Sequence, residues 1–373
     1  MTLLRATAFH ARAADANRHN AWTTRNDTTL AQHYDSAEDE ALAARLNVVV
    51  ADVSWRWRVM LEGPSAGPFL SRLMTRDVNA LVPGISLKAL WLSDAGGVRG
   101  AGLVARFGRE KFQLVASAPD GEWIASAAAT MGVQMRDVST ETGGLAVIGS
   151  YANATLKAAE LDADLEPLAF RKLSWRGIAV TVSRWGEHGG FEIWCAPDDG
   201  VLVWDRLMRA GAAYGIAPAG VSAMDLLDIE AGVPRPRLDY NPARNASDTE
   251  PMPAAFGLES LIDEAHKGFN GQKALLAAKP SRKLVGLEIA AEEPAPFTPV
   301  MLSDRAAGHT LRSLYSPALK RAVALATVDA AVATPGTMLS LTLPATMAHP
   351  ELRKASARVT RLPFLPAPAS IAE

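Results

Sequence analysis

A single glutamate follows a glycine-rich turn in the middle of the chain. The turn comprises residues 186–190, and the alternating pattern of residues 191–196 predicts a strand that carries Glu192. A carboxylate in this position can accept two hydrogen bonds from a flat heterocycle that presents adjacent N–H donors. We therefore expect Glu192 to anchor a ligand and to contribute to catalysis.

The composition is that of a globular protein that acts on small molecules. The chain has 373 residues, of which 49% are hydrophobic and 21% charged, and its formal net charge is -2. We therefore expect two or three packed modules, without disorder and without a nucleic-acid-binding surface. The lone cysteine, Cys195, excludes an intramolecular disulfide and fits a reducing compartment, so we expect a cytoplasmic protein.

Metal and membrane functions are not indicated by the sequence. The seven histidines show no metal-ligand spacing. No apolar run approaches the roughly 18 residues that a membrane span requires. A small-molecule substrate is thus the expected partner, and these features predict no oligomeric state.

Hydrophobic periodicity predicts helices and strands in alternation over the first 280 residues. Helical spacing marks residues 33–49, 66–74, 121–131, 154–161, 200–210 and 223–231. Strand patterns mark residues 48–61, 91–107 with a turn at 94–97, 111–117, 145–150, 177–183 and 191–196. We expect the first fourteen residues to be frayed.

After residue 280 the pattern changes. Short strands separated by turns are predicted at residues 284–289, 300–302, 321–327, 338–343 and 354–360. This spacing predicts an all-β module of about 90 residues.

Two motifs in the same order carry a family resemblance. Residues 183–193, Ser-Arg-Trp-Gly-Glu-His-Gly-Gly-Phe-Glu-Ile, resemble a glycine-rich turn that ends in G-F/Y-E-I in the folate-binding aminomethyltransferase family, the family of the glycine cleavage T-protein. Residues 220–232, Gly-Val-Ser-Ala-Met-Asp-Leu-Leu-Asp-Ile-Glu-Ala-Gly, resemble the family segment G-x-x-A-R-D-x-L-R-L-E-A-G. Further matches at residues 52–54, 75–78, 267–272, 284–287 and 316–319 extend the resemblance over nearly the whole chain.

The resemblance implies a fold and a cofactor. The implied fold class is α+β, with two interleaved α+β domains around a central cavity over residues 1–280 and a C-terminal β-barrel domain over residues 281–373. Because the family binds tetrahydrofolate, the resemblance implies that Glu192 meets the pterin ring and that Trp185 stacks beside it. Tetrahydrofolate is therefore the expected cofactor.

Departures from the family pattern point away from glycine cleavage. The family carries two aspartates on the strand after the turn at residues 96–97, and one of them positions the aminomethyl nitrogen. Gly100 and Ala101 follow that turn in this chain, so the carboxylate is missing. The folate-contacting arginine of A-R-D is replaced by Met224.

Basic residues stand where the family pattern is altered. Lys88 replaces a tyrosine, Arg99 follows the glycine turn, and two more arginines lie in the altered segment 233–240. Charge-assisted contacts from these residues would suit an anionic or phenolic substrate. An ammonium buried in an apolar pocket can also act as a base, so we expect Lys88 to be catalytic. The predicted substrate contacts are Arg99, Arg235, Arg237, Tyr240 and Trp55.

Three functions remain open at this stage. The first is a tetrahydrofolate-dependent demethylase that acts on a small, anionic aromatic substrate, and the retention of Glu192 favours it. The second is a folate-independent lyase of the same fold, which releases formaldehyde from a hydroxymethyl-bearing aromatic compound, and the loss of the arginine at Met224 favours it. The third is a non-catalytic folate-binding factor of the iron–sulfur-assembly type, but Phe269 replaces the cysteine that such factors carry. We place the demethylase first.

Overall fold

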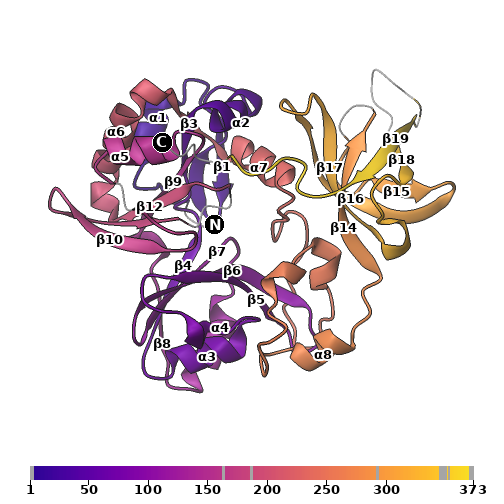
Figure 1. Ribbon diagram of the computed structural model, residues 1–373, viewed down its shortest axis with the longest axis horizontal. Helices are drawn as coiled ribbons and strands as arrows, with labels where there is room; N and C mark the ends of the chain where they lie inside the picture. Colours follow the sequence, from indigo (N-terminus) through magenta and orange to yellow (C-terminus); the bar gives the residue numbers. More distant parts are fainter. Residues whose placement is uncertain are drawn as a thin grey trace.

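The computed structural model describes residues 4–161, 164–184, 188–290, 294–343, 351 and 353–368. Two β-sheets, each flanked by helices, form the larger part of the molecule, and a β-barrel lies beside them (Figure 1). The expected α+β fold with a C-terminal barrel is confirmed.

The first sheet has six strands and is covered by helices on both faces. Its strands, in spatial order, are β10 (Phe170–Trp175), β11 (Ile178–Ser183), β12 (Phe191–Cys195), β9 (Gly143–Ile148), β3 (Val48–Asp52) and β13 (Ile216–Ala219). One face packs against α1 (His10–Ala16), α5 (Ala152–Ala158) and α6 (Gly200–Ala210). The other face packs against α2 (Ala37–Leu46) and α7 (Val221–Glu230).

The second sheet has five antiparallel strands. They are β5 (Ser86–Leu92), β6 (Val98–Gly108), β7 (Lys111–Ala116), β4 (Trp57–Glu62) and β8 (Gln134–Asp137). Its outer face packs against α3 (Ala66–Leu73) and α4 (Gly121–Ala129). On its other face, Leu103 and Val115 meet Phe170 and Trp194 of the first sheet. The two sheets therefore face each other.

The chain interleaves the two sheets. It leaves the first sheet after β3, builds the whole second sheet, and returns at β9. Our prediction of one strand over residues 48–61 is wrong, because residues 53–56 form a turn between β3 and β4. In this turn the backbone N–H of Ser54 donates to Asp52 Oδ1 at 2.9 Å. Alternation alone could not reveal that the two halves belong to different sheets.

From residue 4 onward the N-terminal segment is ordered, contrary to expectation. Phe9 is fully buried in the core beside the first sheet. The backbone of Arg5 pairs with Asp27 and Thr29 near the hairpin of β1 (Trp22–Arg25) and β2 (Thr28–Ala31). The burial of Phe9 gives this segment a packing energy that keeps it in place.

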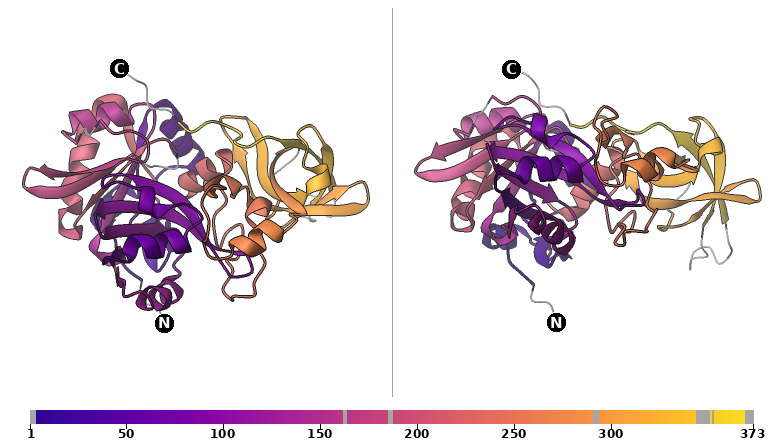
Figure 2. Two further views of the ribbon diagram at one scale, coloured as in Figure 1. Left: turned by 60° about the horizontal axis from the view of Figure 1, so that its bottom comes forward. Right: turned by 90° about the horizontal axis from the view of Figure 1, so that it is seen from below.

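Six strands close the C-terminal barrel. Their spatial order is β14 (Arg282–Ile289), β17 (Arg321–Asp329), β16 (Arg305–Ser316), β15 (Pro299–Leu302), β18 (Met338–Leu343) and β19 (Arg353–Thr360). The sequence pattern located five of them and missed β16, whose alternation is broken by Gly308 and by a register shift between Thr310 and Ser313. Figure 2 shows the barrel at one end of the molecule and the last described residues running back toward the sheets.

Two charged residues connect the barrel to the sheets. Glu230 is fully buried at the end of α7, and it accepts hydrogen bonds from Arg45 of α2 and from Ser316 of the barrel. Arg312 of β16 donates to Asp239 at 2.9 Å and to the carbonyl oxygen of Val233 at 3.0 Å. These contacts fix the loop after α7, which also forms part of the cavity described below.

We predict that Arg312→Met lowers the free energy of unfolding by about 3 to 5 kcal/mol, because it leaves the buried Asp239 without its cation. Urea denaturation measures this loss. Arg305→Met on the same strand is the control, since Arg305 forms an exposed pair with Asp329 and such pairs contribute little. Equal losses in the two variants would contradict the anchoring role of Arg312.

Candidate active site

A cavity of about 270 Å³ lies where the second sheet meets the segment after α7. Strands β5, β6 and β7 provide one wall, through Lys88, Ala101 and Val115 among others. The opposite wall comes from residues 232–236 and from the segment that follows η5 (Pro253–Phe256), which includes the short turn η6 (Glu259–Leu261). The lining residues are Arg56, Lys88, Ala101, Gly102, Val115, Ala116, Ser117, Gly232, Val233, Pro234, Arg235, Pro236, Gly257, Leu258, Ser260 and Leu261.

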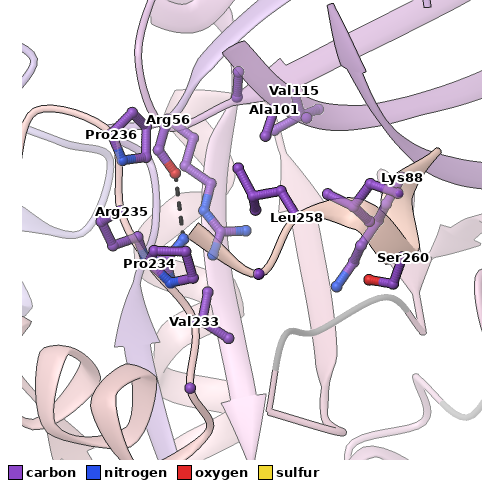
Figure 3. Close-up of a pocket in the computed structure, with 16 residues that line it drawn as sticks. Arg56, Lys88, Ala101, Val115, Val233, Pro234, Arg235, Pro236, Leu258 and Ser260 are labelled. Carbon is purple, nitrogen blue, oxygen red and sulfur yellow. Dashed lines mark hydrogen bonds between the residues drawn. The ribbon is translucent and has the colours of Figure 1, made fainter. Parts of the chain in front are cut away.

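The charged residues in this lining all carry positive charge. They are Arg56, Lys88 and Arg235, and no acidic side chain is among the lining residues that the structure describes. Figure 3 shows Arg56 reaching into the cavity between Arg235 and Lys88. A concave site whose charged groups are all cationic and whose remaining walls are apolar raises the local concentration of anionic ligands. The cavity is therefore suited to a small anion with an apolar body.

Glu192 lies behind Arg56 and does not line the cavity. It is fully buried on β12. Its Oε1 accepts a hydrogen bond from Arg56 Nη1, and its Oε2 accepts one from Trp194 Nε1 at 3.0 Å. Both oxygens of the predicted heterocycle anchor are thus engaged by side chains of the protein itself.

Arg235 is held by a second buried carboxylate. Asp228 on α7 accepts hydrogen bonds from Arg235 Nε at 2.5 Å and from Nη2 at 2.7 Å. Its Oδ1 also lies 2.9 Å from Nε2 of the buried His188. Burial alone would raise the pKa of Asp228, but Arg235 and His188 outweigh that effect and hold this pKa well below its usual range.

Sequence reasoning gave Asp228 no role, although a signal was present. Asp228 stands at the second arginine position of the family segment A-R-D-x-L-R-L-E-A-G. In the structure this position supplies the counter-charge for Arg235, which belongs to the altered segment after α7. The two departures from the family pattern therefore meet in a single contact of this chain.

A smaller cavity of about 30 Å³ adjoins the first and shares Arg56 and Arg235 with it. Its lining contains three carboxylates, Asp52, Asp225 and Asp228. Burial raises the pKa of Asp52 and of Asp225. The two arginines therefore separate a region lined by cations from one that also contains acids.

Of the predicted substrate contacts, Arg235 lines the larger cavity and Trp55 lines the smaller one. Lys88, predicted as catalytic, also lines the larger cavity and is half-buried. Arg237 is exposed. Trp185 falls outside the described residues.

Arg99 and Tyr240 lie away from both cavities. The Arg99 guanidinium forms two hydrogen bonds with Asp120, at 2.9 and 2.8 Å, and lies over the ring of Trp123. Tyr240 is buried with its ring 4.8 Å from that of Phe256. Their role as substrate contacts stays a prediction, and neither side chain belongs to the lining described here.

The position of the missing family carboxylate is closed by a tryptophan. A Cβ atom at Gly100 would lie 2.1 Å from Cζ2 of Trp91, so no side chain fits there beside that ring. Trp91 is fully buried, and its Nε1 donates to Asp120 Oδ2 at 3.0 Å. Ala101, in contrast, lines the cavity.

Comparison with known proteins agrees with this architecture. The family model of the GCVT N-terminal domain matches residues 4–252, and that of the glycine cleavage T-protein C-terminal barrel domain matches residues 282–365. The chain belongs to the folate-binding aminomethyltransferase family. A similar solved structure, the glycine cleavage system aminomethyltransferase T from Bartonella henselae, has a TM-score of 0.87 with 21% sequence identity and covers 99% of this chain and 100% of its own. It shows that the fold is shared.

Curated relatives of the family are enzymes of one-carbon metabolism. An aminomethyltransferase from Bacillus pumilus (strain SAFR-032) is 33% identical over 328 residues, which cover 84% of this chain and 87% of the relative. One from Thermotoga neapolitana is 30% identical and covers 89% and 90%. A trimethylamine-oxide aldolase from Ruegeria pomeroyi is 30% identical and covers 81% of this chain but 40% of the aldolase. The expectation of an enzyme is confirmed.

Within the described residues, no helix combines the length and the apolar character needed to cross a membrane. The same part of the chain contains no group of three or more His, Cys, Asp or Glu side chains placed to hold a metal ion.

We predict that Asp228→Asn lowers the free energy of unfolding at pH 7 by about 3 to 5 kcal/mol, because Arg235 loses its buried counter-charge. Since the pKa of Asp228 is lower in the folded state, its stabilisation is fully present above the unfolded-state value of about 3.9 and is lost as the pH falls below it. Urea denaturation at a series of pH values should therefore show the difference between wild type and variant shrinking below about pH 4. A difference that does not change with pH would contradict this assignment.

Proposed function

We propose that this protein removes a one-carbon unit from a small, anionic aromatic substrate. The observation that carries the proposal is the cavity lining, in which Arg56, Lys88 and Arg235 are the charged residues. Small and apolar residues such as Ala101, Gly102 and Leu258 leave room for a flat ring between these cations.

The position of each cation suggests how such a substrate would bind. Arg56 and Arg235 line both cavities and therefore stand at their junction, whereas Lys88 lines only the larger cavity. A carboxylate or phenolate at the junction would receive charge-assisted hydrogen bonds from guanidinium groups, whose planar donors suit paired oxygens. The remainder of the ring would then extend along β6 toward Lys88.

The arrangement does not fit tetrahydrofolate well. A pterin ring needs a carboxylate that accepts from its adjacent N–H donors, and Glu192 is the residue that the family resemblance assigns to this role. Its oxygens already accept from Arg56 and Trp194, and no other carboxylate lines the larger cavity among the described residues. The described lining therefore offers no carboxylate that is free to hold the pterin ring.

Of the reactions open at the sequence level, this geometry favours the folate-independent lyase. Lys88, entering from β5, would accept the hydroxyl proton of a hydroxymethyl substituent. The C–C bond would then break, formaldehyde would leave, and the bonding electron pair would remain on the substrate carbon. That carbanion would take up a proton or expel a phenoxide from the neighbouring carbon, and Arg56 and Arg235 would stabilise the phenoxide.

The tetrahydrofolate-dependent demethylase remains the second candidate, and one observation favours it. Glu192 keeps its family position on β12, directly after the glycine turn. If Arg56 turned away when the cofactor bound, the carboxylate would become available to a pterin. This candidate requires a conformational change that the lyase does not.

Formaldehyde release distinguishes the two candidates. Purified protein freed of folate should be incubated with hydroxymethylated and methoxylated aromatic acids, with and without added tetrahydrofolate. The lyase releases formaldehyde from the hydroxymethylated acids without cofactor, whereas the demethylase converts the methoxylated acids only when the cofactor is present. A preference for cationic amines, or aminomethyl transfer with lipoyl carrier protein, would overturn the proposed substrate class.

We predict that Lys88→Met lowers turnover of the hydroxymethylated aromatic acid about a hundredfold to ten-thousandfold, the usual contribution of a general base. Because Arg56 and Arg235 remain in the cavity, binding of the acid should change much less than turnover. Steady-state kinetics measures the two effects as kcat and KM. The exposed Lys279→Met is the control, and a Lys88 variant with the same kinetics as this control would remove Lys88 from the site.

A further inference from the structure

We infer that Arg56 determines which class of ligand this site accepts, because it occupies the carboxylate that would hold a heterocycle and converts the position into an anion-binding one. The inference deepens the proposed function and rests on it for the anionic nature of the substrate. It concerns binding specificity and assigns no chemical step to Arg56.

The place of Arg56 in the fold explains why a single residue can have this effect. It ends the turn between β3 and β4, where the chain crosses from the first sheet to the second. It contacts Glu192, and it lines both cavities. Its side chain is 4% exposed, so its position is set by packing. Any ligand that approaches Glu192 from the cavities therefore meets the Arg56 guanidinium.

A second guanidinium lies close to Arg56 along the chain. Arg58, two residues later, is fully buried and donates hydrogen bonds to the carbonyl oxygens of Val53, Ser54 and Arg56. Glu192 accepts a hydrogen bond from Arg56 and also attracts Arg58. Glu192 therefore interacts with two guanidinium groups, and of these Arg56 is the one that lines the cavities.

The pKa of Arg58 reflects these neighbouring charges. Burial and the nearby Arg56 lower this pKa, Glu192 and Asp52 oppose the shift, and the net value is about 10. An anion bound beside Arg56 would receive charge-assisted hydrogen bonds from its guanidinium. A neutral heterocycle would instead place its N–H donors against the N–H donors of the guanidinium, which is an unfavourable contact.

The first experiment replaces Arg56 and measures binding of two probes by calorimetry. The probes are 4-hydroxy-3-methoxybenzoate, an aromatic acid, and 5-formyltetrahydrofolate, a stable reduced folate. Arg56→Met should weaken benzoate binding about tenfold to a hundredfold and should gain measurable folate binding, because Glu192 then becomes accessible. Arg56→Lys should keep most of the benzoate affinity, since it retains the charge. Arg209→Met, at an exposed position of α6, is the control and should match wild type for both probes.

The second experiment breaks the same ion pair from its other side. Glu192→Gln releases Arg56 from its internal partner, so benzoate binding should become tighter than in wild type, while no folate binding should appear. A merely structural role of the pair predicts weaker benzoate binding in both variants. The opposite signs expected for Arg56→Met and Glu192→Gln therefore test specificity separately from stability.

Several outcomes would overturn the inference. They are folate binding by wild type as tight as by Arg56→Met, unchanged benzoate binding in Arg56→Met, or weaker benzoate binding in Glu192→Gln. Thermal melting of each variant confirms that it is folded, and if Arg56→Met does not fold, Arg56→Lys and Glu192→Gln still decide through the benzoate affinities. Failure here is distinguishable from failure of the proposed function, because cofactor-free formaldehyde release by wild type does not depend on any of these variants.

Discussion

The ion pair between Arg56 and Glu192 is the contact on which the arrangement of the site depends. It joins the turn that connects the two sheets to a central strand of the first sheet, at a point where water is excluded. A buried charge without a partner is strongly unfavourable, so each residue constrains the other. Trp194 then orients the carboxylate, and its ring packs against the second sheet with Leu103 and Val115. Through Trp194, the buried ion pair and the packing of the two sheets therefore depend on each other.

The fold was largely predictable because periodicity reports which face of a strand or helix is buried. Helices α3 and α6, for example, were located to within a residue or so of their observed bounds. Periodicity does not report which sheet a strand joins, and this is why β3 and β4 were taken for one strand. It also fails where a strand is polar for a tertiary reason, as in β16, whose Arg312 reaches out of the barrel to Asp239.

The site was predictable only in part, because a residue's partner decides its role. Lys88 and Arg235 proved to line one cavity, although neither motif spacing nor charge could show that Arg99 would instead be bound by Asp120. Arg56 was overlooked because it lies just beyond the D-x-S match and resembles an ordinary strand arginine. Its importance becomes visible only when Glu192, 136 residues away along the chain, is placed beside it.

The tryptophan that covers Gly100 also limits how this protein can evolve. A side chain at position 100 would collide with the Trp91 ring, and a smaller residue at position 91 would leave a void in the core of the second sheet. Either substitution alone is therefore harmful, and only the pair together could restore a carboxylate there. Such mutual dependence makes the change at position 100 difficult to reverse one mutation at a time. Ala101, which lines the cavity, is free of this constraint.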